Sequence, residues 1–392
     1  MSAYQQSIKI SNKFLVLQSI KNHEPISRAH LSQQLNLTKA TVSSLVEELI
    51  EEGYCHQTGP GKSSGGRRPL MLKFNEKTGY SIGIDIGVNY VLGILTDLRG
   101  NIMFEKNQKM NTNDFNQTIL FIEEVISEFI QKGAESNRGV IGIGIGVPGI
   151  VNLDGNVLYT PNLQWEQADL KNIISEKYSL PVIVENEANA GAYGEKCFGV
   201  GKESADLVYI SLGIGIGTGL ILDNKLYRGK SGLSGEMGHM IIESQGKLCG
   251  CGSKGCWELY ASERALINRA HEVIGSKYGS EPSLEGLMDA ARKDHEVKTL
   301  FDEIGYYLGV GINNIINTFN PEQIIIGNRL TIAKDHLHTS LMQVIKEKTL
   351  NEHQTNLTVN YANLSQYSTA LGSSAYSIEH YFKEIFQTDI AF

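Results

Sequence analysis

The sequence predicts a mixed α/β protein, with an N-terminal winged helix-turn-helix followed by a body of two α/β lobes. Two observations predict this fold class. Three short amphipathic segments and a glycine-rich hairpin fill the first 75 residues, and strands then alternate with helical stretches around two glycine-rich turns. The chain has 392 residues, enough for two or three domains of about 150 residues each. A hydrophobic content of 41% excludes a largely disordered chain.

Three helices are predicted in the head. Apolar residues from Phe14 to Ile20 recur at helical spacing, and this first helix stops before Pro25, whose ring disfavours a helical residue ahead of it. Ser27 is placed to cap a second helix, and Thr38 to cap a third after the turn at residues 36–37. Two helices joined by so tight a turn are typical of a helix-turn-helix.

The third helix carries small and polar side chains on its outer N-terminal face, which would let it approach base edges in a major groove. The candidate DNA-contacting residues on this helix are Lys39, Thr41, Ser43 and Ser44.

A wing is predicted after Gly53, where two short strands flank a glycine-rich tip that carries Arg67 and Arg68. Guanidinium groups suit DNA phosphates or a narrow minor groove. A three-helix unit is often only a packing module, and an arginine pair is often solvated surface. The helix order, the arginine tip and the local charge together favour DNA. Residues 1–80 carry a net charge of +4, whereas the remainder carries −12.

The body repeats one pattern twice. The first set consists of strands at 80–87, 91–97 and 141–147 with a helix at 123–130, and the second has strands at 208–212 and 219–222 around the glycine run 213–217. Such a repeat indicates a duplicated fold with a ligand cleft between the lobes. A helix predicted at 305–319 has glycine and apolar faces, which would suit either the interior of the body or a dimer interface.

The expected organisation is therefore a head at 1–75, a first lobe at 76–190, and a second lobe at 191–367 with the dimerisation surface. We expect a C-terminal helix at about 368–392 to pack back on the first lobe.

A metal site is predicted in the second lobe. One imidazole and three thiolates lie close enough in sequence for a loop to fold around one ion, and this donor set is typical of a closed, structural zinc site. The predicted ligands are His239, Cys249, Cys251 and Cys256. The alternative is a group of free cysteines beside an unrelated histidine. Cys55 and Cys197 have no such partners in sequence and are expected to act as small hydrophobic residues.

At the level of motifs the chain resembles the ROK family (repressors, open reading frames and sugar kinases), which belongs to the actin-like and hexokinase-like ATPase superfamily. The resemblance covers essentially the whole chain. It rests on Asp85-Ile86-Gly87, Val147-Pro148-Gly149, the run from Glu185 to Ala192, and the long signature from Gly235 through His239 and the cysteines to Glu258. The resemblance implies an actin-like, sugar-kinase-like ATPase fold for the body.

The resemblance also implies a sugar site in the cleft. The family's sugar contacts fall on Gly149, Asn186, Glu187, Glu236, His239 and Glu258. Carboxylates, amides and imidazoles can pair with several sugar hydroxyls, so a wrong sugar would leave polar groups unsatisfied. His239 would offer one ring nitrogen to zinc and the other to the sugar.

Kinase chemistry is expected to be lost. The family's catalytic Asp falls on Glu187, one methylene longer, and the Thr of the second phosphate turn falls on Ile214, which has no hydroxyl. The first turn, from Asp85 to Tyr90, lacks the lysine that the family's kinases carry.

The resemblance and the head together imply a repressor that binds operator DNA as a homodimer and is released by a sugar, with xylose favoured by the overall likeness. One rival is an active ATP-dependent sugar kinase with a DNA-binding head, and another is a sugar-sensing module with a partner other than DNA. With no apolar run near 18 residues and no signal-like N-terminus, we expect no membrane partner and a cytoplasmic location.

Overall fold

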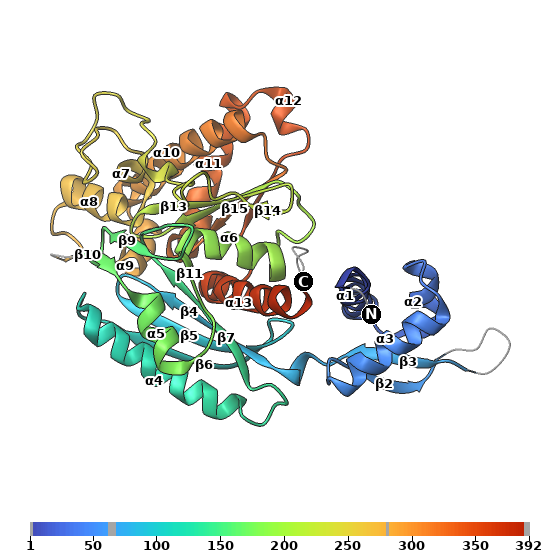
Figure 1. Ribbon diagram of the computed structural model, residues 1–392. Helices are drawn as coiled ribbons and strands as arrows, with labels where there is room; N and C mark the ends of the chain where they lie inside the picture. Colours follow the sequence, from blue (N-terminus) through green and yellow to red (C-terminus); the bar gives the residue numbers. More distant parts are fainter. Residues whose placement is uncertain (1–2, 62–67, 280–281, 388–392) are drawn as a thin grey trace.

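The computed structural model describes residues 3–61, 68–279 and 282–387, and it shows a small head beside a larger two-lobed body (Figure 1). None of the helices in these ranges is long and apolar enough to cross a membrane.

The head is a winged helix-turn-helix, as the sequence predicts. Its elements are α1 (Ala3–His23), β1 (Ile26–Ser27), α2 (Arg28–Gln34), α3 (Lys39–Glu51), β2 (Cys55–Pro60) and β3 (Leu70–Phe74). The strands pair in the order β1-β3-β2. Both predicted caps are confirmed, because the Ser27 side chain accepts a hydrogen bond from the His30 amide and the Thr38 side chain accepts one from the Thr41 amide.

The first lobe is built on a five-stranded sheet in the order β11-β7-β4-β5-β6. Its strands are β4 (Tyr80–Ile86), β5 (Tyr90–Asp97), β6 (Ile102–Lys109), β7 (Val140–Val147) and β11 (Val182–Asn186). A short 3-10 helix, η1 (Glu76–Thr78), leads into it, and α4 (Phe115–Gly133) and α5 (Leu170–Tyr178) pack on its strands. A small second sheet joins β8 (Ile150–Val151), β9 (Val157–Thr160) and β10 (Trp165–Ala168).

The second lobe repeats the first, with a sheet in the order β14-β13-β12-β15-β16. Its strands are β12 (Leu207–Leu212), β13 (Ile216–Leu222), β14 (Lys225–Leu226), β15 (Gln323–Gly327) and β16 (Thr358–Tyr361). In both lobes an antiparallel hairpin is followed by two parallel neighbours: β4 pairs with β5 and β7 as β12 pairs with β13 and β15. The predicted duplication is thus present strand for strand.

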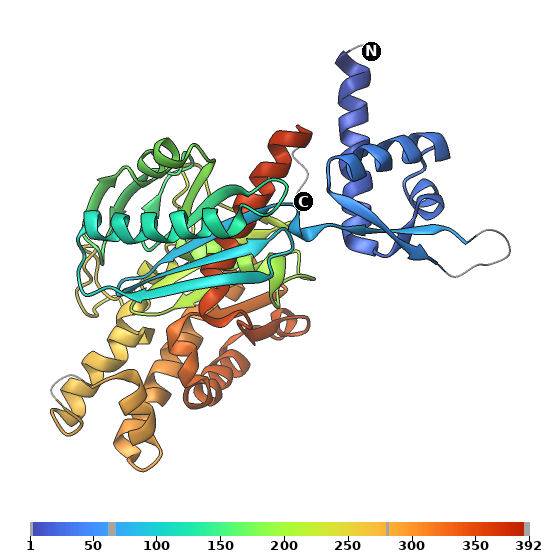
Figure 2. The same ribbon diagram turned by 90° about the horizontal axis from the view of Figure 1, so that it is seen from below.

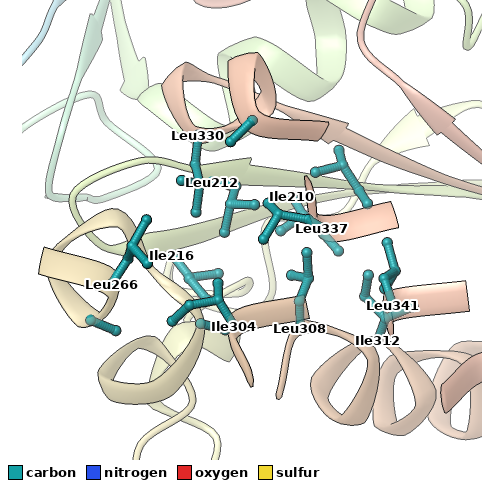
Figure 3. Close-up of a cluster of buried hydrophobic side chains, with 14 of the residues drawn as sticks. Ile210, Leu212, Ile216, Leu266, Ile304, Leu308, Ile312, Leu330, Leu337 and Leu341 are labelled. Atoms are coloured by element: carbon teal, nitrogen blue, oxygen red, sulfur yellow. The ribbon is translucent and has the colours of Figure 1, made fainter. Parts of the chain in front are cut away.

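Helices cover the second sheet and supply the largest hydrophobic core. They are α7 (Glu258–Ala261), α8 (Glu263–Ile274), α9 (Leu284–Ala291), α10 (His295–Phe319) and α11 (Lys334–Lys348), with 3-10 turns η2 (Met237–His239) and η3 (Arg329–Ala333). Helix α12 (Asn351–Gln354) and the 3-10 turn η4 (Ser365–Tyr367) have no buried residues and lie outside this core. Figure 3 shows side chains of β12, α10 and α11 meeting in this core.

The segment 305–319 is the second half of α10 and packs inside the body along its glycines. A Cβ atom added to Gly305 would lie 2.6 Å from the Leu337 carbonyl oxygen of α11, and one added to Gly309 would lie 3.0 Å from the Leu341 carbonyl oxygen. These glycines let two helix backbones approach closely. Of the two settings left open by the sequence, the glycine face therefore occupies the interior.

Two helices link the lobes and the head. Helix α6 (Glu187–Phe198) contacts strands of both sheets, so the expected boundary after residue 190 falls inside a helix that the lobes share. Helix α13 (Ser368–Phe386) lies between α6 and strands β4 and β7 (Figure 1). It contacts β4 and β7 at Gly83 and Gly144, where an added Cβ would clash with the α13 backbone.

The far end of α13 holds the head. The Tyr381 hydroxyl lies 2.9 Å from the Tyr54 hydroxyl, and the Phe386 ring centroid lies 5.2 Å from that of Phe14 on α1. Beside this contact, Arg99 of the first lobe forms an ion pair of 2.9 Å with Glu24 of the head. The buried side chains of head and body form one hydrophobic cluster here. The head is therefore docked on the body by side-chain packing and is not joined to it by the chain alone. Figure 2 shows the end of α13 approaching the head from the body.

The substitution Phe386→Ala should therefore weaken the joint between head and body. Phe386 is 3% exposed, and truncating so buried a ring costs about 3 kcal/mol or more. Urea unfolding should show this destabilisation together with faster proteolysis between head and body. The neighbouring Ile385, 37% exposed, is the control, since Ile385→Ala should cost less than about 1 kcal/mol. Equal effects of the two substitutions would contradict the docked head.

Candidate functional site

The face of α3 that the sequence assigns to DNA is open. Lys39 and Ser44 are exposed, and Thr41 and Ser43 are half-buried at the start of the same helix. Two acidic residues farther along α3, Glu47 and Glu48, are paired with basic side chains of other helices, with Glu48 2.6 Å from the Lys9 amine. Similar pairs join Arg28 to Glu47 and Lys13 to Glu52. The basic Lys39 end therefore faces outward without competing acidic charge nearby on the helix.

The wing strands pack against the same helix, since β2 contacts α3. Arg68 is exposed just before β3, whereas Arg67 lies outside the described residues. A groove runs between α2 and the wing strands, and its described lining holds His30, Gln33 and Lys73 but no carboxylate. Its lining therefore offers hydrogen-bond donors and positive charge to a polyanion.

The four predicted metal ligands come together. Their candidate ligand atoms, from His239, Cys249, Cys251 and Cys256, all lie within 4.8 Å of one another. The Cys251 and Cys256 sulfurs are 3.6 Å apart, and the Cys249 sulfur lies 3.6 Å from His239 Nδ1. A tetrahedral ion with ordinary zinc bond lengths gives about 3.8 Å between two sulfurs and about 3.6 Å between sulfur and nitrogen. The two separations in the structure match this geometry and the remaining donor atoms lie within 4.8 Å, so a small contraction would bring all four around one ion.

The metal cluster also places three of the candidate sugar residues. Glu236 immediately precedes η2, which ends at His239, and Glu258 begins α7 just after the last cysteine. The Glu258 carboxylate lies 3.7 Å from His239 Nδ1 and accepts a hydrogen bond from the Cys249 thiol. Burial, with a further contribution from Glu258, raises the pKa of Glu236 against the opposing effect of His239.

The other three candidate sugar residues lie on the first lobe. The Asn186 side-chain oxygen caps α6 by accepting hydrogen bonds from the amides of residues 188 and 189, and its nitrogen donates to the Gly149 carbonyl at 2.8 Å. Glu187 accepts a hydrogen bond of 3.1 Å from the Ser211 hydroxyl, and burial raises the pKa of Glu187. The hydrogen bond between Asn186 and Gly149 thus fixes the Asn186 side chain. The second hydrogen of the side-chain amide can be donated to a ligand.

Both groups meet at the glycine run of the second lobe. A Cβ added to Gly215 would lie 2.8 Å from the Glu258 carboxylate, and one added to Gly217 would lie 4.0 Å from that of Glu187. The structure therefore places the two sets of candidate residues on either side of one turn.

The first phosphate turn is filled by a side chain. The Tyr90 ring lies against Gly87, in the space that a Cβ would occupy, and its hydroxyl donates to Asp85 at 2.7 Å. The second Asp85 oxygen is buried without a partner among the described residues. Burial, and next the charge of Glu187, raise the pKa of Asp85 to about 8. From the sequence alone, this turn shows only the missing lysine.

The second phosphate turn is also occupied. Asn328 follows β15 with φ +70° and ψ −174°, a conformation that strongly favours glycine. Its side-chain nitrogen donates to the Ser211 hydroxyl at 2.9 Å and lies beside Gly213, 3.2 Å from where a Cβ would be. Asn328, Ser211 and Glu187 therefore form a hydrogen-bonded series from the turn to the sugar side. Sequence analysis missed Asn328 and Ser211, which no motif marks.

The fold and the site define a class: a winged helix-turn-helix head joined to a duplicated body of the sugar-kinase type. The family model described as "ROK family" matches residues 81–379, and the one described as "MarR family" matches residues 11–58 of the head. The chain belongs to the ROK family, and the expected fold class is confirmed.

Relatives and solved structures agree with this class. The chain is 43% identical over 381 residues to the xylose repressor of Bacillus subtilis, covering 97% of this chain and 98% of that one. A crystal structure of a ROK family transcriptional regulator, a homologue of the Escherichia coli MLC protein, matches with a TM-score of 0.82 at 30% identity, covering 97% and 98% of the two chains. A ROK family glucokinase from Streptomyces griseus, solved with glucose and AMPPNP, matches with a TM-score of 0.66 at 31% identity over 76% of this chain and 98% of that one.

The substitution Cys251→Ser should abolish metal binding. A closed four-ligand site holds about one ion per chain, and a hydroxyl is a poor replacement for a thiolate. Elemental analysis of the purified chain measures the metal content directly. The half-buried Cys197 supplies the control, since Cys197→Ser removes a thiol outside the cluster and should keep the ion. Equal metal content in both variants would argue against the cluster.

The raised pKa of Asp85 predicts a pH dependence of stability. Between pH 3.8, the ordinary pKa of this carboxyl, and about pH 8, Asp85 is protonated in the folded chain but ionised in the unfolded chain. The contribution of Asp85 to the unfolding free energy should therefore fall as pH rises through this window and level off above it. Unfolding measured from pH 5 to pH 9 should show a flatter profile for Asp85→Asn than for the unaltered chain. Parallel profiles would refute the assignment.

Proposed function

We propose that this protein is a sugar-responsive transcriptional repressor, which binds operator DNA through its head and is released when xylose binds in the cleft of the body. One observation carries the proposal. A helix-turn-helix head is docked on a sugar-kinase-type body whose two phosphate turns are filled by the protein's own side chains. The relatives named as xylose repressors support both the function and the choice of sugar.

The sugar would be held between the two groups of candidate residues. Gly149, Asn186 and Glu187 would contact it from the first lobe. From the second lobe, carboxylates at 236 and 258 would accept its hydroxyl hydrogens, and His239 would use the ring nitrogen that faces away from the cysteines. A site that pairs each hydroxyl discriminates against sugars that leave a polar group unsatisfied.

Zinc is the ion we propose for the His239 and cysteine cluster. Three thiolates and an imidazole gathered within 4.8 Å of one another suit zinc, and with four protein ligands no position would be open for chemistry. The ion's role is to fix the loop that carries Glu236 and Glu258, so removing it should impair the sugar response.

We propose that the chain has no kinase activity. Glu187 and Ile214 stand at altered positions of the kinase pattern, and two further residues add to the argument. The Tyr90 ring lies against the first phosphate turn, and the Asn328 side chain lies against the second, where nucleotide phosphates would need the backbone amides free. The rival, an active sugar kinase, predicts sugar-dependent ADP production in a coupled assay, and we expect none.

Operator binding would need two heads. Helix-turn-helix proteins commonly recognise paired half-sites as dimers, so we propose a homodimer whose head spacing depends on the angle between the lobes. A sugar that favours an angle incompatible with both half-sites would weaken DNA binding by linkage.

The double substitution Arg67→Ala and Arg68→Ala should weaken DNA binding and lower its salt dependence. Removing one interaction with a DNA phosphate reduces the slope of log affinity against log salt by about one. Fluorescence anisotropy with a labelled duplex from the region upstream of the protein's own gene measures both quantities at several salt concentrations. Arg292→Ala, on an exposed residue at the end of α9, is the control and should leave both unchanged. Unaltered binding in the double variant would rule out a wing contact.

A further inference from the structure

An ion pair beneath the candidate sugar site joins the two lobes. Arg228 follows β14 of the second lobe, and its Nε donates to the Glu185 carboxylate of β11, in the first lobe, at 2.7 Å. Glu185 is buried, with its side chain 8% exposed. Because the two partners sit on different lobes, any change in the angle between the lobes must strain or break this pair.

Each partner of the pair is also tied to candidate sugar residues. The other Glu185 oxygen accepts a hydrogen bond from the Asn186 backbone amide at 2.9 Å and one from the Asn189 side chain at 3.0 Å. The Arg228 carbonyl accepts a hydrogen bond from the Ser234 amide, which closes the loop that leads to Glu236. Ligand contacts at Asn186 and Glu236 would therefore act on the two ends of this ion pair.

The pair touches the helix that holds the head. The Arg228 guanidinium lies over the ring of Tyr376 on α13, 5.3 Å from the ring centroid. The Tyr376 ring stacks on that of Tyr193 from α6, with centroids 4.2 Å apart and planes at 2°. The Tyr193 hydroxyl then donates to Glu379, one turn farther along α13. These contacts lead from the lobe junction toward Tyr381, which meets the head.

The buried end of this series carries an unpaired polar group. The Tyr376 hydroxyl is buried without a hydrogen-bond partner among the described residues. The residue is 6% exposed, and its ring contacts Arg228 and Tyr193. A buried hydroxyl without a partner is unfavourable, so this part of α13 is sensitive to small shifts of its neighbours.

We propose that Arg228 is a positioning residue that transmits the sugar-dependent movement of the lobes to α13 and so to the DNA-binding head. This inference rests on the proposed function and names its regulation. In the sugar-free state Arg228 holds Glu185 and the Tyr376 stack, and α13 keeps the head in its docked position. Lobe movement on sugar binding displaces the guanidinium, the stack of Tyr376 on Tyr193 shifts, and the α13 end carries the shift to the head.

A matched control is available within the chain. Arg264 on α8 also bridges the lobes, donating to the Asn162 side chain at 2.9 Å, and this hydrogen bond does not involve α13. If bridging the lobes were sufficient, Arg264→Met and Arg228→Met would act alike. If contact with α13 matters, only Arg228→Met should alter the response of the head.

The test measures operator affinity by fluorescence anisotropy with and without saturating xylose. Sugar should weaken DNA binding by roughly 5-fold to 150-fold in the unaltered chain, the usual range of coupling between two sites, and by less than about twofold in Arg228→Met. The sugar-free DNA affinity of Arg228→Met should already be lowered toward the sugar-bound value of the unaltered chain, because the guanidinium that holds α13 is absent. Arg264→Met should keep both the sugar-free affinity and the full sugar effect. Undiminished coupling in Arg228→Met would overturn the proposal.

Hydrogen exchange without sugar separates this proposal from the proposed function. Arg228→Met should speed amide exchange in residues 376–386 of α13 and 14–20 of α1, because both segments lose their support, whereas Arg264→Met should not. If exchange changes in this way while xylose has no effect on the unaltered chain, the result supports the role of Arg228 in holding α13 and contradicts xylose as the sugar. If exchange in both segments is unchanged, the proposed role of Arg228 is wrong, whether or not sugar weakens DNA binding.

Discussion

The close packing of α13 on the first lobe is the constraint on which the rest of the structure depends. Gly83 and Gly144 present bare backbone to this helix, and Gly372 of α13 presents bare backbone to Ala190 of α6. Such contacts leave no room for a side chain, so the first turns of α13, around residues 370–373, are held close against the sheet and α6. Because its other end packs on Phe14 and Tyr54, the position of the head follows from the same packing.

The body has the sugar-kinase type of fold, and side chains of the chain itself lie against its two glycine-rich turns. The Tyr90 ring packs against Gly87 and the Asn328 side chain lies beside Gly213, and Asn328 does so from a strained backbone conformation. Tyr90 donates a hydrogen bond to Asp85. Asn328 donates one to Ser211, which in turn donates to Glu187. On our proposal the cleft binds a sugar alone, and the head is the element that responds.

Much of this could be predicted from the sequence, because the relevant signals are local. The caps Ser27 and Thr38 lie next to the helices they begin, and the four metal ligands lie within 18 residues of one another. The repeated strand pattern likewise predicts the duplicated lobes. The ion pair between Arg228 and Glu185 joins residues 43 positions apart. Asn328 donates a hydrogen bond to Ser211, on a strand more than a hundred residues earlier. Neither spacing nor residue type marks such contacts, since only the packed lobes bring them together.

Isothermal titration of xylose into the metal-loaded protein, free and then bound to its operator, tests the central claim most directly. Linkage requires that a sugar which weakens DNA binding is itself bound more weakly by the DNA complex, by the same factor. We predict xylose binding that weakens by roughly 5-fold to 150-fold when DNA is present, with glucose and N-acetylglucosamine as controls. Equal xylose affinity in the two states would contradict a repressor released by this sugar.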